Sequence, residues 1–443
     1  MAIPTFKVLF ETMMCGIKGE HRVSFATVQD VINHVENSTP RPHILELDIS
    51  RLRPLDFQGG VALGHVLDYS SYSLRSLTLR MAQPGPSDSL KDFMQAVEVQ
   101  NYGSLVSLRI HGFYPTTLHT SFSNLTHLTL GRLFCERHLF PIEFFLAAMG
   151  AWTKLKSLEI EQYSRVIEGI EGEPPMIITM PNLESLKIHD TPDWADALIS
   201  CLDLPRLAQL HIHGMFDTLP WGGHLLGSWV PYLSDSASAL LRSVDHVHIQ
   251  VAQNPGELTT VAATGSGDRR FVLDAEVPPS HAPRWPSWQL KVLGTIMPVL
   301  ADVFPRAHHF RIVGDFATVN KTTWYNFLGA YPELYELHIK DIAHREAAPL
   351  FLALNESDLP DDQDMLCPQL EYISLHGVVH STQLIQEMYR ALRVRGENEV
   401  MIAQLDVYAR VLAESFVGDP RLNPDFRSAV EAAVGSFTYA AFE

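Results

Sequence analysis

Cysteine is scarce in this chain of 443 residues, and its placement excludes two common uses of the residue. The four cysteines, Cys15, Cys135, Cys201 and Cys367, lie far apart and form no C-x-x-C pair. Domains held by disulfides and cysteine-based zinc sites both need closely grouped cysteines. Neither kind of protein fits the sequence.

Long apolar runs and positive charge are also in short supply. Lys7 and Glu11 interrupt the N-terminal stretch where a signal peptide needs an unbroken apolar run, and no later stretch is long enough to span a membrane. Lys and Arg number 33 against 51 Asp and Glu, which gives a net charge of −18. Such a surface repels phosphate backbones, and no basic cluster stands out in the sequence. We therefore expect a cytoplasmic or nuclear protein with no nucleic-acid and no membrane partner.

Recognisable catalytic motifs are missing as well. The sequence has no G-x-S-x-G elbow and no phosphate-binding glycine loop. The run from Gly265 to Gly267 is better explained as a hairpin turn, because no helix with a Lys-Ser/Thr start follows it. We expect no enzyme activity and no cofactor.

What the chain does contain is a repeated apolar triad, L-x-x-L-x-I. The clearest copies are Leu183, Leu186, Ile188 and Leu207, Leu210, Ile212. The apolar side chains of such a strand share one face, and a single strand cannot bury that face. A similar strand must pair beside it, so that the two bury their apolar side chains together. About twelve copies occur, and they end at Ile49, Leu79, Ile110, Leu130, Ile160, Ile188, Ile212, Ile249, Ile312, Ile339, Leu375 and Val407.

Helical periodicity between many of the triads completes the predicted architecture. Residues 144–149, 324–328 and 384–392 carry apolar stripes at helical spacing. Strands alternating with helices predict an α/β solenoid, a horseshoe of about twelve irregular strand-helix repeats. We predict that this solenoid spans residues 43–443, with a β-hairpin insertion at about 251–287 that stands off the array, and a closing helix over 426–434.

A helical cap is predicted over residues 1–42. Phe6, Leu9, Phe10, Met13 and Ile17 fall at helical spacing, and a second apolar stripe runs from Val28 to Val35. A cap at this place would cover the otherwise unpaired edge of the first repeat strand.

In these triads the chain resembles leucine-rich repeat proteins, and more closely the irregular repeats of fungal F-box proteins. The opening VINHVENSTPRPHILELDIS and the tags LRIHG, LHIHG and ISLHG that close strands carry the resemblance, which covers roughly residues 25 to 410. The family usually has Asn or Cys three residues beyond the triad, whereas this chain has Phe113, Leu133, Tyr163, Thr191, Met215 and Val378. No Leu-Pro-x-Glu opening of an F-box is recognisable in residues 1–40.

The residues between the apolar positions point to the other face of each strand, which is the concave surface of a horseshoe. Candidate partner-binding residues on this face are Arg80, Arg109, His111, His127, Glu159, Glu161, Lys187, His189, His211, His213, His246, His248, Arg311, His338, Lys340 and His376. Trp221, Trp229 and Tyr232 are candidate anchors on a neighbouring loop, although such aromatic residues more often pin down their own loop. Any soluble sheet also needs a polar outer face, so a purely solvated surface remains the alternative.

Four of these histidines suggest a metal site as a further alternative. His211, His213, His246 and His248 form H-x-H pairs on two strands that we expect to be neighbours, about 4.8 Å apart, so that the four side chains could converge on one ion. No carboxylate shares their columns, so we expect no metal.

Together these observations predict a protein-protein recognition module. The resemblance implies the substrate-binding repeat region of an F-box type ubiquitin ligase receptor. The alternative is a free-standing leucine-rich repeat scaffold or inhibitor with no ligase link. A Skp-type adaptor becomes an expected partner only if an F-box lies upstream of Met1.

Overall fold

Two compact units make up the chain: residues 1–213 with 234–237, and residues 214–233 with 238–443. The computed structural model describes residues 6–14, 17–25, 33, 37, 44–48, 74–80, 102–111, 122, 124–131, 142–162, 176–215, 235–254, 257–276, 285–343, 347–355, 365–411 and 424–442. The fold is α/β, and most of its strands are parallel.

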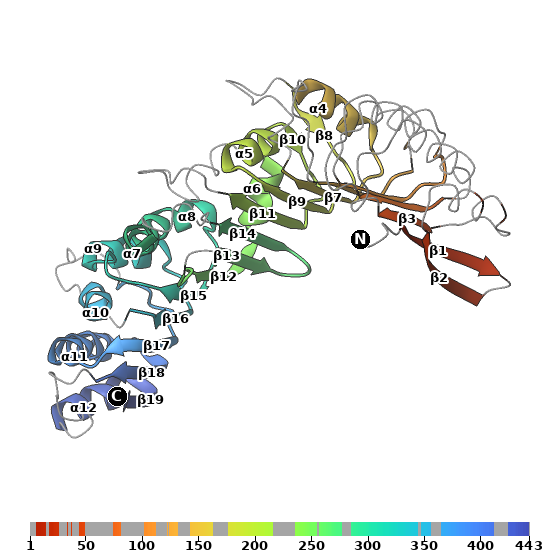
Figure 1. Ribbon diagram of the computed structural model, residues 1–443. Helices are drawn as coiled ribbons and strands as arrows, with labels where there is room; N and C mark the ends of the chain where they lie inside the picture. Colours follow the sequence, from red (N-terminus) through yellow and green to blue (C-terminus); the bar gives the residue numbers. More distant parts are fainter. Residues whose placement is uncertain are drawn as a thin grey trace. The chain divides into compact units, whose positions relative to one another are not determined.

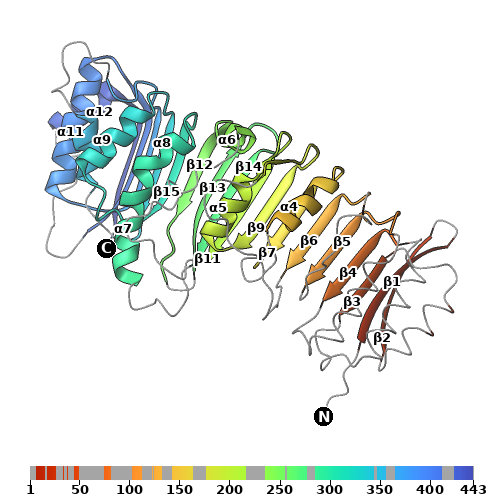
Figure 2. The same cartoon turned by 90° about the horizontal axis from the view of Figure 1, so that it is seen from above.

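The first unit is built on a run of parallel strands, which Figure 2 shows side by side. These are β3 (Ile44–Asp48), β4 (Ser76–Arg80), β5 (Ser107–His111), β6 (His127–Gly131), β7 (Ser157–Glu161), β9 (Ser185–Asp190) and β11 (Gln209–Met215). A small parallel pair, β8 (Ile178–Thr179) and β10 (Leu202–Asp203), lies apart from this sheet.

The strands of the second unit repeat the arrangement. They are β12 (Val244–Gln250), β13 (Leu258–Gly265), β14 (Arg270–Glu276), β15 (His309–Gly314), β16 (Glu336–Asp341), β17 (Tyr372–Val379), β18 (Ile402–Arg410) and β19 (Val434–Phe442). β12, β15, β16, β17, β18 and β19 pair in this order, and all of these pairings are parallel. β13 pairs antiparallel with both β12 and β14.

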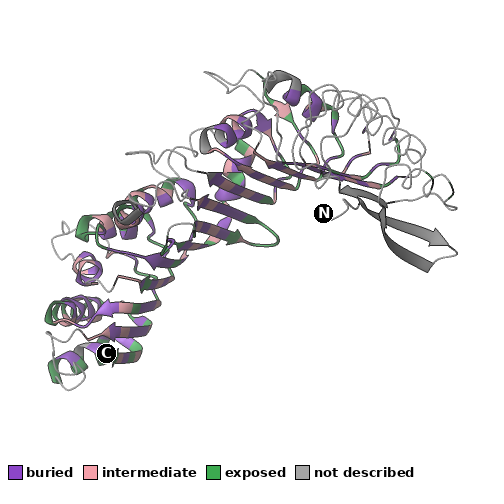
Figure 3. Cartoon of the chain, viewed as in Figure 1, coloured by how far each residue is buried: buried purple, intermediate pink, exposed green. Residues whose placement is uncertain are grey.

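The predicted triads lie in register from strand to strand, except the first, which was predicted to end at Ile49. Its predicted middle position, Leu47, pairs with Leu79, the last position of the next triad, and Ile49 lies outside the described residues. Leu108 on β5 pairs with Leu128 on β6, which pairs with Leu158 on β7, and all three are at most 1% exposed. In the second unit the corresponding row includes Val247, Phe310, Leu337, Ile373 and Leu405. Figure 3 shows buried positions alternating with less buried ones along these strands. The apolar side chains of neighbouring strands therefore form one continuous core within each unit.

A fourth buried residue, which the triad did not predict, precedes each of eight strands. It lies three residues before the first triad position, and its backbone carbonyl accepts a hydrogen bond from that position's N–H at 2.9–3.2 Å. These residues are Tyr102, Phe122, Trp152, Met180, Leu204, Phe304, Tyr331 and Cys367, all at most 4% exposed. Each turn is thus closed by a backbone hydrogen bond and anchored by a buried side chain.

The helices lie along one face of the sheet in each unit (Figure 1). They are α4 (Ile142–Ala151), α5 (Pro192–Ser200), α6 (Asp235–Leu241), α7 (Trp285–Ile296), α8 (Leu300–Val303), α9 (Lys321–Ala330), α10 (Ala348–Leu354), α11 (Thr382–Glu397) and α12 (Pro424–Ala433), with a 3-10 turn, η4 (Met297–Val299), between α7 and α8. The helices predicted over 144–149, 324–328, 384–392 and 426–434 are confirmed as α4, α9, α11 and α12. No helix among the described residues is both long and apolar enough to cross a membrane.

The helix predicted at the start of the N-terminal cap is wrong. Residues Phe6–Met14 form β1 and Ile17–Phe25 form β2, an antiparallel hairpin whose first strand also pairs with β3. A short apolar run satisfies both helical and strand periodicity, and its aromatic and β-branched residues favour a strand. The edge of β3 is therefore covered by a hairpin. The second predicted helix falls almost entirely outside the described residues.

The hairpin predicted in the insertion is confirmed, but the prediction that it projects away from the repeats is wrong. β13 pairs antiparallel with β12 on one side and with β14 on the other, so the hairpin extends the sheet of the second unit. Val261, Phe271 and Leu273 are at most 2% exposed. Their burial explains the docking, because these apolar side chains would otherwise face water.

The last strand, β19, was not predicted. Its Phe437 and Tyr439 pair with Leu405 and Val407 of β18. With Val434 they repeat the triad spacing, but aromatic residues replace Leu and Ile and conceal the pattern.

We predict that Phe304→Ala destabilises the second unit by roughly 3–5 kcal/mol, because it empties a fully buried site. The Phe304 ring lies 5.7 Å from the Phe271 ring of β14, so the hairpin should also lose protection in amide hydrogen exchange. Chemical unfolding and exchange mass spectrometry measure both effects.

The matched control is Leu258→Ala on the same hairpin, at a side chain that is 37% exposed. It should change stability by no more than about 0.5 kcal/mol. Equal losses in both variants would contradict the view that the buried turn residue holds the hairpin on the sheet.

Candidate functional site

The candidate site is the polar face, defined here as the side of the parallel strands that points away from the apolar core. No described helix covers this side in either unit. Of the predicted partner-binding residues on it, Arg109, His127, His246, Arg311, Lys340 and His376 are exposed, whereas His111, Glu159, Glu161, Lys187, His189, His211, His213, His248 and His338 are half-buried. Arg80 lies on β4, but its side chain is outside the described set, as are Trp221, Trp229 and Tyr232.

An ionic group occupies the middle of the polar face in the first unit. Arg109, Thr129, Glu159 and Lys187 come from four strands and lie in one row of the register. Lys187 Nζ donates to Glu159 Oε1 at 2.6 Å, and Thr129 Oγ1 donates to Glu159 Oε2 at 3.4 Å. Burial raises the pKa of Glu159, but the hydrogen bond and charge of Lys187 and the charge of Arg109 outweigh burial, so the pKa ends below its ordinary value. Glu159 is therefore ionised at neutral pH.

A glycine makes room for the neighbouring row. A side chain at Gly131 on β6 would place its Cβ 2.6 Å from His111 Nδ1 and 3.1 Å from Glu161 Oε2. His111 on β5 and Glu161 on β7 therefore lean over Gly131 from the strands on either side. A glycine at an outward strand position is a sequence signal for such a close approach.

Further along this row, the rings of His189 on β9 and His213 on β11 are 3.9 Å apart. The contact supplies stacking surface and hydrogen-bonding nitrogens, which suit recognition of another molecule.

In the second unit, histidines converge on one carboxylate. Glu336 Oε2 lies 3.2 Å from His309 Nδ1 and 3.6 Å from His338 Nε2. The His309 ring also stacks on that of His246 at 4.1 Å, nearly parallel, and Asp245 Oδ1 lies 2.6 Å from His246 Nδ1. His246 and His338 are among the predicted partner-binding residues, whereas their contacts with Asp245 and Glu336 were not predicted.

Tyr372 on β17 and Tyr408 on β18 contribute aromatic rings to the same face. Tyr372 donates to Asp406 Oδ2 at 3.0 Å, and Gln404 donates to the same oxygen at 2.7 Å. The His376 ring stacks on that of Tyr408 at 4.4 Å. These contacts fix the rings in place, so much of the face is organised before any partner arrives.

The four histidines considered as a metal site divide between the units. His211 and His213 lie on β11 in the first unit, and His246 and His248 lie on β12 in the second. Asp245 is already close to one ring nitrogen of His246.

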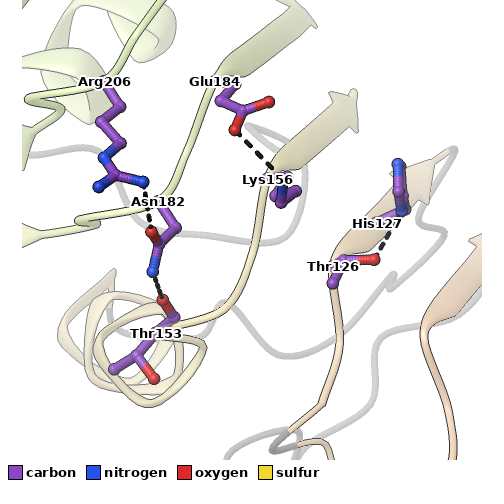
Figure 4. Close-up of polar contacts among 7 residues, drawn as sticks. All are labelled: Thr126, His127, Thr153, Lys156, Asn182, Glu184 and Arg206. Atoms are coloured by element: carbon purple, nitrogen blue, oxygen red, sulfur yellow. Dashed lines mark hydrogen bonds and ion pairs between the residues drawn. The ribbon is translucent and has the colours of Figure 1, made fainter.

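Polar ladders at the leading turns position the strands, and sequence reasoning missed them. Figure 4 shows Asn182 between its neighbours in the first unit: its amide donates to Thr153 O at 2.8 Å, and Arg206 donates to its Oδ1 at 3.1 Å. Asn124 repeats the arrangement with Gly103 and Lys154. In both cases Asn directly precedes the first triad leucine, which is the signal that could have revealed the ladder.

Two histidines of the second unit carry a lowered pKa. At His248, burial is the main cause and the charge of Arg311 the second. At His376, burial again leads, followed by Lys340, and Asp406 only partly opposes the shift. The hairpin does not separate β12 from β15, so His248 and Arg311 are direct register partners.

We predict that acid weakens the fold through these two residues. The folded chain binds fewer protons there than the unfolded chain, whose histidine pKa is about 6.5. Their stabilising contribution is therefore complete above that value and is lost as the pH falls through it. The melting temperature should be lower at about pH 5.5 than at about pH 7.5, and H248Q/H376Q should narrow the difference. A double variant that loses as much on acidification as the parent would contradict this assignment.

Comparison with known proteins does not assign a family. No family model matches the chain, and no curated protein matches it either. Among solved structures, the chain is similar to one described as the crystal structure of a TLR13–ssRNA13 complex, at 11% identity and a TM-score of 0.33. The match covers 94% of this chain and 49% of that chain, so this chain spans about half the length of that protein. The register of the strands themselves establishes the α/β fold.

Proposed function

We propose that the chain is a protein-recognition module that binds its partner through the polar face. The supporting observation is the common register of the strands, which lines up side chains from successive strands in rows on a face that no described helix covers. Arg and Tyr on that face are residue types enriched at protein interfaces. A surface fixed by backbone pairing also loses little conformational entropy on binding.

We further propose that the repeats form a leucine-rich-repeat solenoid of the kind found in F-box type receptors, in the cytoplasm or nucleus. Support comes from the sequence resemblance and from the recurrence of the buried turn residue before eight strands. We propose no catalytic role. On the polar face, the Asp406 carboxylate is engaged by Tyr372 and Gln404.

The charge pattern of the polar face should decide partner binding. We predict that E159K/K187E, which exchanges the two ends of an ion pair, reduces partner binding at least about tenfold because it inverts the local charges. Net charge is unchanged and the pair can re-form, so stability should change by less than about 1 kcal/mol. Quantitative affinity capture from cell extract, with a melting curve of each variant, measures both effects.

The matched control exchanges an ion pair on a helix. On α12, Arg427 Nε lies 2.9 Å from Glu431 Oε1, and the two side chains are 72% and 65% exposed. R427E/E431K therefore makes the same exchange of charges on the side of the sheet that carries the helices. Partner capture by this variant should equal that of the parent. Equal loss in both variants would mean that the polar face is not the binding surface.

The identity of the captured proteins separates the two versions of the function. Skp and cullin subunits among them would support the ligase receptor. Their absence, with another protein captured through the polar face, would support the scaffold or inhibitor.

A further inference from the structure

Two cationic side chains, Arg311 and Lys340, lie together with three histidines on the polar face of the second unit. The cationic patch consists of His248 on β12, Arg311 on β15, His338 and Lys340 on β16, and His376 on β17. His248 pairs in register with Arg311, Arg311 with His338, and Lys340 with His376. These residues are scattered over more than a hundred positions, so the sequence shows no basic cluster.

Two members of the patch lack the partners expected in so acidic a chain. Arg311 and Lys340 are exposed, and neither forms an ion pair within the described part of the chain, although acidic residues outnumber basic ones by 51 to 33. His248 Nε2 is buried and has no hydrogen-bond partner among the described residues. Two exposed cations without an ion-pair partner among the described residues can form charge-assisted hydrogen bonds with an incoming anion.

The nearest carboxylates on the face are already engaged. Asp406 accepts hydrogen bonds from Tyr372 and Gln404. Glu336 lies against the rings of His309 and His338. Both are placed by those contacts, and neither pairs with Arg311 or Lys340. The positive charge of these two residues is thus left for another molecule.

We propose that the cationic patch binds an acidic peptide segment of the partner protein, whose carboxylates pair with Arg311 and Lys340. This inference rests on the proposed protein-binding function and names the chemistry of the partner. From β12 to β17 the patch crosses three strand intervals of about 4.8 Å each. An extended peptide advances about 3.4 Å per residue, so a segment of about five residues spans the patch.

The spacing of the two cations favours carboxylates on alternate residues. Arg311 and Lys340 lie on neighbouring strands, and Lys340 pairs with Val313, two residues beyond Arg311. Such diagonal neighbours are about 7–8 Å apart. Side chains at alternate positions of an extended peptide share one side and are separated by about the same distance.

An acidic peptide fits better than a nucleic acid. The net charge of −18 repels any polyanion, but this repulsion is screened beyond about 8 Å at physiological salt. A short peptide can confine its charges to the patch. A nucleic acid carries phosphates at every step, so many of them would meet the acidic remainder of the chain.

Proton uptake should accompany binding. The lowered pKa values of His248 and His376 reflect burial and the charges of Arg311 and Lys340. Bound carboxylates would offset those charges and raise both values. The other charged or titratable groups facing these histidines are His338, Asp406 and Tyr408, whose ring stacks on that of His376. On the other side, β13 presents Ala262 beside His248. Binding should therefore strengthen as the pH falls from about 7.5 to about 6, where peptide glutamates stay ionised.

The test measures binding of a five-residue peptide in which three glutamates alternate with serines to the full chain. Isothermal titration or NMR should detect it, whereas the peptide with glutamine in place of glutamate should bind at least about tenfold more weakly. R311Q/K340Q should weaken the glutamate peptide by about tenfold or more, and lower pH should strengthen it. The control R393Q/R427Q removes the same charge from exposed positions on α11 and α12 and should leave peptide binding unchanged.

Equal binding of the glutamate and glutamine peptides would overturn the proposal, as would equal binding by R311Q/K340Q and the parent. A single-stranded oligonucleotide that binds the patch more tightly than the peptide would also overturn it. These failures are distinguishable from failure of the proposed function. If E159K/K187E abolishes partner capture while R311Q/K340Q has no effect on the peptide, protein recognition stands and the acidic partner segment does not.

Discussion

The fold depends on backbone carbonyls that several strands offer to the strand beside them. The carbonyl of Lys156, just before β7, accepts hydrogen bonds from the N–H groups of both Glu184 and Ser185 at 2.8 and 3.0 Å. The carbonyl of Tyr335 serves Glu371 and Tyr372 in the same way in the second unit. These shared acceptors set the register. Because side chains alternate between faces, a slip of one residue would move polar groups into the core and apolar groups to water.

The polar face inherits its organisation from this register. Glu159 can meet Lys187, and Glu336 can meet His309, because paired strands bring those positions opposite one another. The fixed rows also explain how cations that are distant in sequence, such as Arg311 and Lys340, come together in a chain of net charge −18. Recognition chemistry here is a consequence of strand pairing.

The parts of this structure that follow from periodic burial could be predicted from sequence. Leu158 and Ile160 repeat a spacing that only a strand with one buried face explains, and they are fully buried. The buried turn residues could not be predicted because Tyr102, Trp152 and Cys367 are all buried but have side chains of different types, so no pattern of residue types marks them. The N-terminal hairpin could not be predicted because the apolar residues of Phe6–Met14 fit both helical and strand periodicity. Partners across strands, such as Tyr372 with Asp406, depend on a register that one sequence does not reveal.

The most direct test of the central claim is hydroxyl-radical footprinting of the chain alone and bound to its captured partner. We predict that His246, His376 and Tyr408 on the polar face lose modification in the complex. Tyr325 on α9 and Tyr389 on α11, on the helical side, should react equally in both states. Protection of the two helical tyrosines, with the polar face unchanged, would contradict the account.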